Sequence, residues 1–129
     1  MIGRRRALRQ RLQLPGRPKS AAAARALVRV IAASDRQAEN AALVVSEFIA
    51  NSVEHSRSGL PGGIVVLIIE SAPDRSLRIC VRDAGPIRGR EHAPAPDGIP
   101  ESGFGLPLVA AVSASCNVAG RRPWAEVAA

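Results

Sequence analysis

Three polar side chains, those of Glu47, Asn51 and His55, recur at every fourth residue of the stretch SEFIANSVEHS. A step of four residues places side chains above one another along one face of a helix. A carboxylate, an amide and an imidazole in line can do chemistry only if the rest of the chain supplies a site beside them. Taken alone, Glu47 and Asn51 also suit a solvated helix edge, and His55 near a helix C-terminus can simply complement the helix dipole.

A second candidate group follows the stretch LRICVRD, in which Leu77, Ile79 and Val81 share one face of a predicted strand. The same alternation places Asp83 on that core side, at the end of the strand. A carboxylate there is costly unless something donates a hydrogen bond to it, and the exocyclic amino group of adenine is a suitable donor. Gly85 would let a base approach the backbone closely. The alternative is a plain turn.

A third group is the pair Gly103 and Gly105, which opens a predicted helix in GFGLPLVAAVSAS. A glycine-rich helix start exposes free N–H groups and the positive end of the helix dipole to phosphate. Gly103, Gly105 and the backbone of Leu106 are therefore candidate phosphate ligands. Pro107 fits only in the first turn of this helix.

These three groups have complementary roles in holding a nucleotide. The side-chain oxygen of Asn51 suits Mg²⁺, which takes its remaining oxygens from water and phosphates. Glu47, one turn away, can accept a proton from an attacking hydroxyl or water. The sequence therefore predicts one site for adenine, phosphate and a magnesium ion.

Two consecutive helices are expected to carry the first group. Ser20 precedes the alanine-rich run AAAARALVRVIAA, which favours a helix ending near Ser34. The next helix begins between residues 35 and 40. Its core-facing stripe consists of Val45, Phe48, Ile49, Ser52 and Val53. Glu47, Asn51 and His55 lie beside this stripe, at the edge of the core.

The remaining segments predict strands and a long loop. A short strand and turn are expected at residues 12–18, an interior strand at 64–70, a strand at 77–83, and two short strands in CNVAG and WAEV. Residues 87–102 are rich in Pro, Gly and charge and predict a lid-like loop. This order predicts a two-layer α/β (α+β) sandwich, with a mixed sheet covered on one face by about three helices.

Charge and composition limit the alternatives. The 129 residues fit one domain, which we expect at 12–129 after a basic, flexible arm at 1–11. Residues 1–40 carry a net charge of +8 and the remainder carries −1, so an arm such as RRRALRQR could meet nucleic acid, a membrane or an acidic protein. No aromatic residues lie between its arginines to stack on bases. The longest apolar run, Ile64 to Ile69, is too short to cross a bilayer, and a cytoplasmic protein is expected.

The ordered motifs resemble those of the GHKL ATPase superfamily, which has the Bergerat fold and includes DNA gyrase and histidine kinases. Within it, the chain is similar to the small anti-sigma-factor serine kinases and short actinobacterial-type ATP-binding regulators. The matching segments are LPGRPKSAAAARALVRVI, LVVSEFIANSVEHS as the N box, VRDAGP and GFGLPLVAAVS as the two glycine boxes, and WAEV as the last strand. They extend over roughly residues 12–127.

This resemblance implies a role for each matching residue. Glu47 is implied as the general base, Asn51 as the Mg²⁺ ligand and Asp83 as the residue that reads adenine. The implied close-approach glycines are Gly85, Gly103 and Gly105. It also implies a serine/threonine protein kinase that uses ATP and Mg²⁺, phosphorylates an antagonist protein and holds a sigma factor inactive in transcription regulation.

Three functions remain open from the sequence. The first is this serine kinase, with a homodimer possible and no membrane contact expected. The second is a nucleotide-gated binding module without phosphate transfer, which is favoured by Ile87 where a second glycine is common and by RRPWAEV, which lacks the threonine common in the last strand. The third is a nucleic-acid-binding domain that depends on Arg4, Arg5 and Arg6, although no direct nucleic acid partner is expected.

Overall fold

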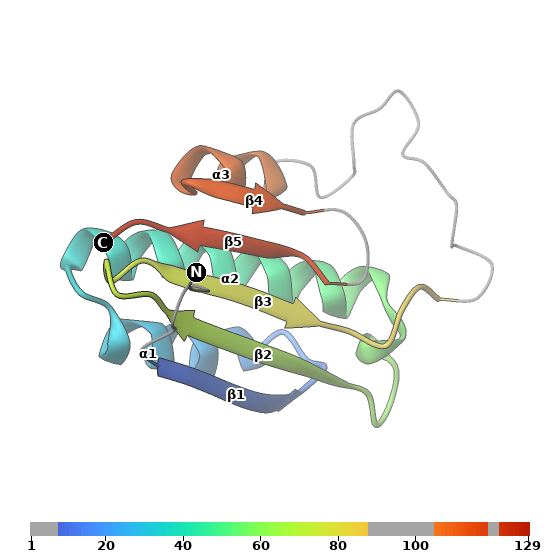
Figure 1. The fold of residues 1–129 in the computed structure, drawn as a ribbon. Coiled ribbons are helices and arrows are strands. Elements are labelled where there is room, and N and C mark those ends of the chain that lie inside the picture. Colours follow the sequence, from blue (N-terminus) through green and yellow to red (C-terminus); the bar gives the residue numbers. More distant parts are fainter. Residues whose placement is uncertain (1–7, 88–104, 119–121) are drawn as a thin grey trace, which may run out of the picture.

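A five-stranded sheet covered on one face by helices forms the protein (Figure 1). The computed structural model describes residues 8–87, 105–118 and 122–129. Strands follow the order β1-β2-β3-β5-β4 across the sheet. The predicted two-layer sandwich is confirmed, with α1 and α2 behind the sheet in Figure 1.

Strand β1 (Leu8–Pro15) begins earlier than the sequence predicted. Arg9 and Arg11 pair with Glu70 and Ile68 of the neighbouring strand, so residues 8–11 belong to the sheet and not to a preceding arm. Their guanidinium groups are exposed, which is why the sequence resembles an arm although the backbone is a strand. Residues 1–7, including Arg4, Arg5 and Arg6, lie outside the described residues.

Two consecutive helices follow as predicted, α1 (Ser20–Ile31) and α2 (Asp35–His55). The side chain of Ser34 caps α2 by accepting a hydrogen bond from the backbone N–H of Gln37 at 3.0 Å. Buried Gln37 also donates through Nε2 to the carbonyl oxygens of Arg75 (2.8 Å) and Val127 (3.1 Å). These bonds fix the N-terminal end of α2 against the sheet.

The strands β2 (Ile64–Ser71) and β3 (Leu77–Arg82) lie in the interior of the sheet. A short turn joins them as an antiparallel pair. Strand β1 is also antiparallel to β2. Helix α1 returns along the sheet and α2 runs back in the direction of β1, so β2 starts at the end of the sheet where β1 stops.

The C-terminal segments complete the other edge of the sheet. Helix α3 (Gly105–Val112) packs against α2, and β4 (Ser115–Asn117) pairs with β5 (Trp124–Val127), which also pairs with β3. Pro107 lies in the first turn of α3, as predicted. All four pairings of the described strands are antiparallel, whereas a mixed sheet was expected.

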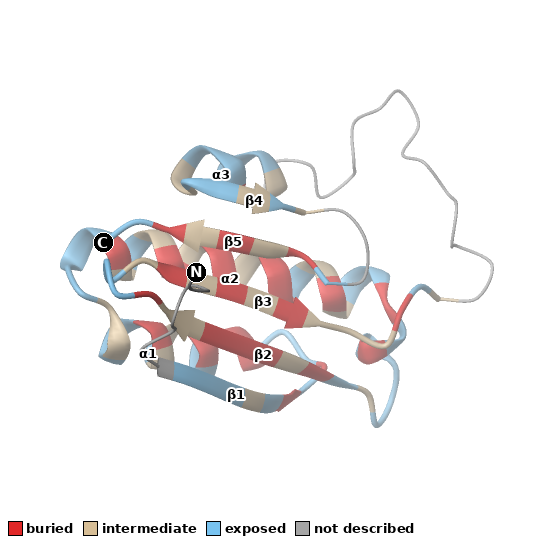
Figure 2. Cartoon of the chain, viewed as in Figure 1, coloured by how far each residue is buried: buried red, intermediate tan, exposed pale blue. Residues whose placement is uncertain are grey.

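The core lies between the sheet and the helices (Figure 2). The stripe of α2 contributes Val45, Phe48 and Ile49, each fully buried, and β3 contributes alternate buried residues. Ser52 is also buried, although it is polar. The opposite face of the sheet points toward the viewer in Figures 1 and 2, and none of the described helices packs on it. In the part of the chain that the structure describes, no helix is both long and apolar enough to span a membrane.

Candidate functional site

The carboxylate of Asp83 is oriented by two hydrogen bonds just beyond the end of β3. Its Oδ1 accepts from the backbone N–H of Gly85 at 2.8 Å, which closes a tight turn. Its Oδ2 accepts from the hydroxyl of Ser52 on α2, at 3.4 Å. The side chain is half-buried, so the structure places an oriented acceptor against α2 as the sequence predicted.

Gly85 has a conformation that suits glycine. Its φ is +91°, in the region that side chains with a Cβ rarely adopt, and the residue is buried. Its carbonyl oxygen accepts a hydrogen bond from the backbone N–H of Arg57 at 2.8 Å. The turn of residues 83–85, which we call the Asp83 turn, is therefore fixed on both sides.

A short 3₁₀ turn, η1 (Arg57–Gly59), supports the Asp83 turn from the C-terminal end of α2. The hydroxyl of buried Ser58 accepts a hydrogen bond from the backbone N–H of Ala84 at 2.9 Å. The guanidinium of Arg57 donates to the carbonyl oxygen of Ala84. The segment after α2 thus holds both polar groups of the Ala84 backbone.

Two glycines crowd the backbone of Ser58. A Cβ added at Gly16 would lie 1.7 Å from the Ser58 carbonyl oxygen, and one added at Gly63 would lie 2.1 Å from the same atom. Both distances are far shorter than the non-bonded contacts of real Cβ atoms, so these positions have room only for glycine. The end of β1 and the start of β2 therefore determine where η1 sits.

We expect Gly16→Ala to destabilise the fold and weaken nucleotide binding together. The added methyl must displace Ser58, and overpacking of this kind costs about 1–3 kcal/mol in the free energy of unfolding. Because Ser58 holds Ala84, the Asp83 turn shifts as well. Urea denaturation measures the first effect and calorimetric titration with ATP measures the second.

Gly62→Ala is the matched control for this prediction. A Cβ at Gly62 meets no atom within 4 Å, but its φ of +80° strains any side chain. It should lower stability by about 1–2 kcal/mol and leave ATP affinity unchanged. Equal effects of both substitutions on ATP affinity would contradict the proposed link from Gly16 through Ser58 to the Asp83 turn.

Helix α2 carries the polar strip predicted from the four-residue spacing. Glu47 and Asn51 are half-buried at the edge of the core, and Asn51 directly precedes Ser52, which contacts Asp83. His55 is exposed, with Nε2 3.7 Å from a carboxylate oxygen of Glu54. Asn51 therefore lies on the helical turn that contacts the Asp83 turn through Ser52, whereas His55 lies on the surface.

The predicted phosphate ligands lie partly within the described residues. Helix α3 begins at Gly105, and Leu106 packs against the core. The described free donors at the start of α3 are the N–H groups of Gly105 and Leu106, because Pro107 has no N–H and the N–H of Leu108 makes the first hydrogen bond within the helix. Gly103 and residues 88–102 of the predicted loop lie outside the described residues.

A cation site made only of protein side chains is not found in the described residues, where no three His, Cys, Asp or Glu side chains cluster. Asn51 was predicted as a single amide ligand for Mg²⁺, and such a ligand needs no cluster, because the ion keeps several waters and binds phosphate oxygens.

Sequence reasoning did not identify Arg57 and Ser58, and it placed Ser52 only in the core stripe. Arg57 and Ser58 hold Ala84 and Gly85, and Ser52 orients Asp83. A serine within the otherwise apolar stripe of α2 was a signal that a polar partner lies opposite. Nothing local marks Arg57 or Ser58, because their partners are about 26 residues away along the chain.

Comparisons with known proteins agree with this architecture. The crystal structure of the RsbU and RsbW domains of Rv1364c from Mycobacterium tuberculosis matches with a TM-score of 0.67 and 20% sequence identity. The match covers 94% of this chain and 32% of that one, so this chain spans about a third of its length. No curated protein matches the chain by sequence.

A family model identifies the chain more directly. The model of the histidine kinase-like ATPase domain matches residues 14–126, which include the polar strip of α2, the Asp83 turn and α3. Histidine kinases are among the members of the superfamily that the sequence motifs resemble, so that expectation is confirmed. The chain belongs to the family of histidine kinase-like ATPase domains.

Proposed function

We propose that this ATPase-family domain binds Mg-ATP beside the C-terminal half of α2 and transfers the terminal phosphate to a serine of a partner protein. The observation that carries the proposal is the pair of hydrogen bonds from Ser52 and Gly85 to Asp83. They hold a carboxylate in place next to the helix that carries Glu47 and Asn51.

The Asp83 carboxylate has capacity left for an adenine amino group. An ionised carboxylate offers about four lone-pair sites, and two of them accept from Ser52 and Gly85. Because the side chain is only half-buried, the other sites remain accessible. Because these remaining sites can only accept hydrogen bonds, they favour a base with an amino group at this position over one with a carbonyl oxygen.

Phosphate and magnesium fit the remaining groups. The free N–H groups at the start of α3 suit phosphate oxygens, and the amide oxygen of Asn51 suits a hard cation. Bound Mg²⁺ would neutralise the charge that develops on the transferring phosphate. Glu47 would act as the general base and accept the proton of the attacking serine hydroxyl. The backbone of the Asp83 turn would hold the adenine ring in place.

The proposed partners follow from the resemblance to anti-sigma-factor serine kinases. A small antagonist protein would supply the serine, and a sigma factor would be held inactive, so the domain would act in transcription regulation in the cytoplasm. The likeness to a structure that contains an RsbW domain supports this assignment at the level of the fold. Self-association into a homodimer belongs to the same proposal.

A second candidate function is a nucleotide-gated binding module that transfers no phosphate. It is favoured by half-buried Ile87, which follows the Asp83 turn where family members often have a second glycine. A branched side chain there restricts the backbone at the start of the loop that would cover the phosphates. This change affects closure over the terminal phosphate more than adenine binding.

We expect Asn51→Ala to remove the magnesium dependence of ATP binding. In the wild type, Mg²⁺ should strengthen ATP binding by roughly tenfold over binding in EDTA, which corresponds to about 1.4 kcal/mol. In the variant the two affinities should converge, because the protein has lost its amide ligand. Calorimetric titration with ATP, with and without Mg²⁺, measures both.

Asn40→Ala is the matched control, since Asn40 is a half-buried residue nearer the start of the same helix. It should keep the magnesium dependence of the wild type. Wild-type protein that binds no ATP under either condition would contradict the proposed site altogether. If ATP binds, incubation with labelled ATP and candidate antagonist proteins then distinguishes phosphate transfer from binding alone.

A further inference from the structure

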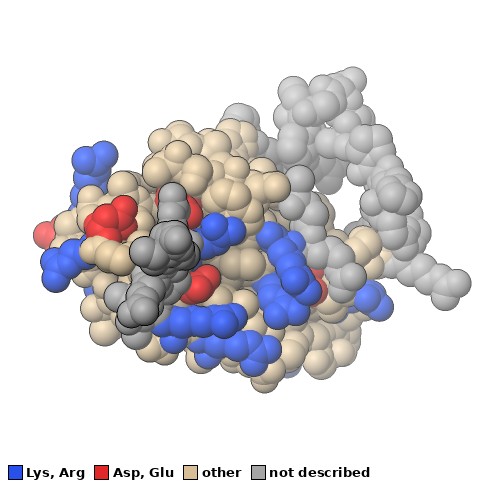
Figure 3. All heavy atoms as spheres, viewed as in Figure 1, with Lys and Arg blue, Asp and Glu red and all other residues tan. Residues whose placement is uncertain are grey.

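The face of the sheet opposite the helices has a defined side-chain pattern, in which the arginines of β1 are exposed, most other side chains are half-buried and Ile68 is buried. Alternate residues of β1, β2, β3 and β5 point to this side and align in cross-strand rows. We call this the open sheet face, and its principal side chains are Arg9, Arg11, Ile68, Glu70, Arg78, Cys80, Arg82, Trp124 and Glu126. Figure 3 views it directly, with Lys and Arg gathered over β1, β2 and β3.

The open sheet face contains a hollow of about 320 Å³. Ile68, Cys80 and Trp124 line it together with arginines, including Arg82 and Arg122. Ile68 pairs with Cys80 in the strand register, and Cys80 pairs with Trp124, so these three form a continuous row. The hollow therefore combines an apolar strip with guanidinium groups.

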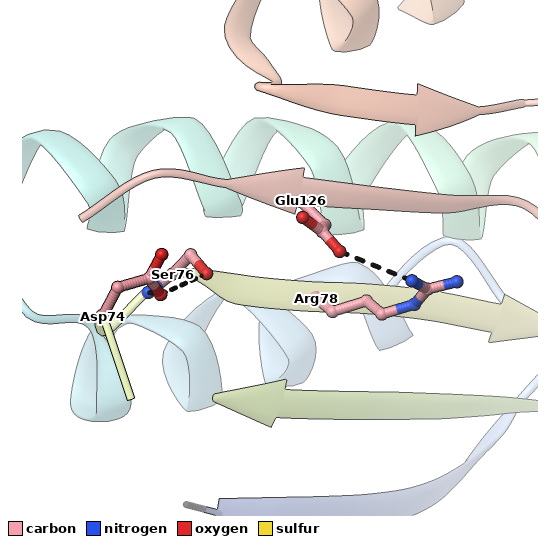
Figure 4. Close-up of polar contacts among 4 residues, drawn as sticks. All are labelled: Asp74, Ser76, Arg78 and Glu126. Atoms are coloured by element: carbon pink, nitrogen blue, oxygen red, sulfur yellow. Dashed lines mark hydrogen bonds and ion pairs between the residues drawn. The ribbon is translucent and has the colours of Figure 1, made fainter. Parts of the chain in front are cut away.

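One arginine is already engaged within the face. The Arg78 guanidinium lies 4.2 Å from the centre of the Trp124 ring. Figure 4 shows the ion pair that Arg78 forms with Glu126, at 3.4 Å. Among the ion pairs of the described residues, the pair of Arg78 and Glu126 lies on the open sheet face. Arg78 therefore covers the indole and is largely neutralised by Glu126.

The other arginines leave the face strongly positive. Together with Arg122, the open sheet face has five arginines against two glutamates, a net charge of +3. Burial raises the pKa of the Cys80 thiol, and Arg78, Arg82 and Arg122 partly oppose this rise. These three arginines line the same hollow as the thiol. The positive electrostatic potential of this face attracts carboxylates and raises the rate at which an acidic partner associates with it.

We propose that the open sheet face binds an acidic segment of a partner protein that also carries apolar side chains. Carboxylates of the segment would pair with Arg11, Arg82 and Arg122. Each guanidinium group can donate two parallel hydrogen bonds to one carboxylate. Its apolar side chains would enter the hollow that Ile68, Cys80 and Trp124 line. This surface is on the other side of the sheet from α2, so the proposal does not rest on the proposed nucleotide site.

The pattern favours a protein segment over nucleic acid or a second copy of the chain. Single-stranded nucleic acid binds by stacking successive bases on several aromatic rings, whereas the named side chains of the open sheet face include a single ring, that of Trp124, with Arg78 over it. A second copy packed face to face would bring two surfaces of charge +3 together. An acidic segment needs no stacking surface and meets a face of opposite net charge.

The test uses a short fluorescein-labelled peptide in which glutamates alternate with leucines. We expect saturable binding by fluorescence anisotropy, and the double variant Arg82→Glu with Arg122→Glu should weaken it by about a hundredfold, or tenfold for each reversed charge. The matched control, Arg29→Glu with Arg36→Glu, changes net charge equally at exposed positions on the helices and should bind as the wild type does.

Several results would overturn the proposal. These are no binding of the peptide, equal loss in both double variants, tighter binding of a single-stranded oligonucleotide, or a protein dimer that the first double variant dissociates. Thermal melts establish that both variants are folded, and Arg82→Gln with Arg122→Gln should give an intermediate affinity. ATP titrations should be the same for all variants, which separates this surface from the nucleotide site.

Discussion

Replacing Asp83 with asparagine is expected to weaken ATP binding by about a hundredfold. The carboxylate accepts hydrogen bonds only, whereas the asparagine side chain has an amide group that donates. Directed at adenine, this NH₂ would face the amino group of the base, so a favourable contact is replaced by two opposed donors. A lost hydrogen bond to a charged group, at about 1.5–3 kcal/mol, gives a change of this size.

The fold should survive this substitution, which makes the result interpretable. The asparagine carbonyl oxygen can still accept from the backbone N–H of Gly85, as Oδ1 of Asp83 does at 2.8 Å. The hydroxyl of Ser52, which now donates to Oδ2, can turn to accept from the asparagine NH₂. Unfolding midpoints in urea should therefore differ little from the wild type.

A change of nucleotide provides the sharpest measurement. ITP has a carbonyl oxygen where ATP has the amino group, so Asp83→Asn should improve the affinity for ITP relative to ATP. Calorimetric titration of both proteins with both nucleotides gives the ratio. Ser52→Ala, which leaves the carboxylate in place, should weaken ATP binding by roughly tenfold at most and keep the preference for ATP. An Asp83→Asn variant with the same ratio of ATP to ITP affinity as the wild type would contradict the assigned role of Asp83.

Replacing Glu47 with glutamine should reduce phosphate transfer by about 10²–10⁴-fold, the range for loss of a general base. Glutamine has nearly the same shape but cannot take the proton of the attacking hydroxyl. ATP affinity should stay within about twofold, because the residue that we propose to recognise adenine is Asp83 and not Glu47. Phosphate release from ATP and labelling of an antagonist protein measure the rate, and calorimetry measures the affinity.

Glu54→Gln is the control for Glu47→Gln. Glu54 lies on the same helix but is exposed beside His55, so its substitution should leave both rate and affinity unchanged. Equal rates for all three proteins would remove Glu47 from the reaction. Wild-type protein that binds ATP tightly but neither releases nor transfers phosphate would instead favour the binding module.

The sequence was sufficient to predict the elements that depend on local pattern. The stripe through Val45, Phe48 and Ile49 identified α2, and the alternation of β3 placed Asp83 on the side of the helices. The early start of β1 was missed because Gln10 interrupts the apolar alternation and the neighbouring arginines are typical of a solvated arm. In the structure those arginines are the exposed side of a strand.

The support of the candidate site could not be predicted in the same way. The contact between Ser52 and Asp83 and the bond from Ala84 to Ser58 join segments whose spacing in the chain carries no signal. Gly16 and Gly63 are typical of turns in the sequence, and only the packing shows that both make room for the Ser58 carbonyl oxygen. Such contacts depend on tertiary structure and not on local propensity.

The contacts of Ser58 have a consequence for the order of folding. Gly16, Ser58 and Ala84 come from three distant parts of the chain, and bringing them together closes large loops at an entropic cost before any contact compensates it. The hairpin of α1 and α2 needs only local contacts to form. A partly folded chain with that hairpin would carry Glu47 and Asn51 but no Asp83 turn, so nucleotide recognition arises only when folding is nearly complete.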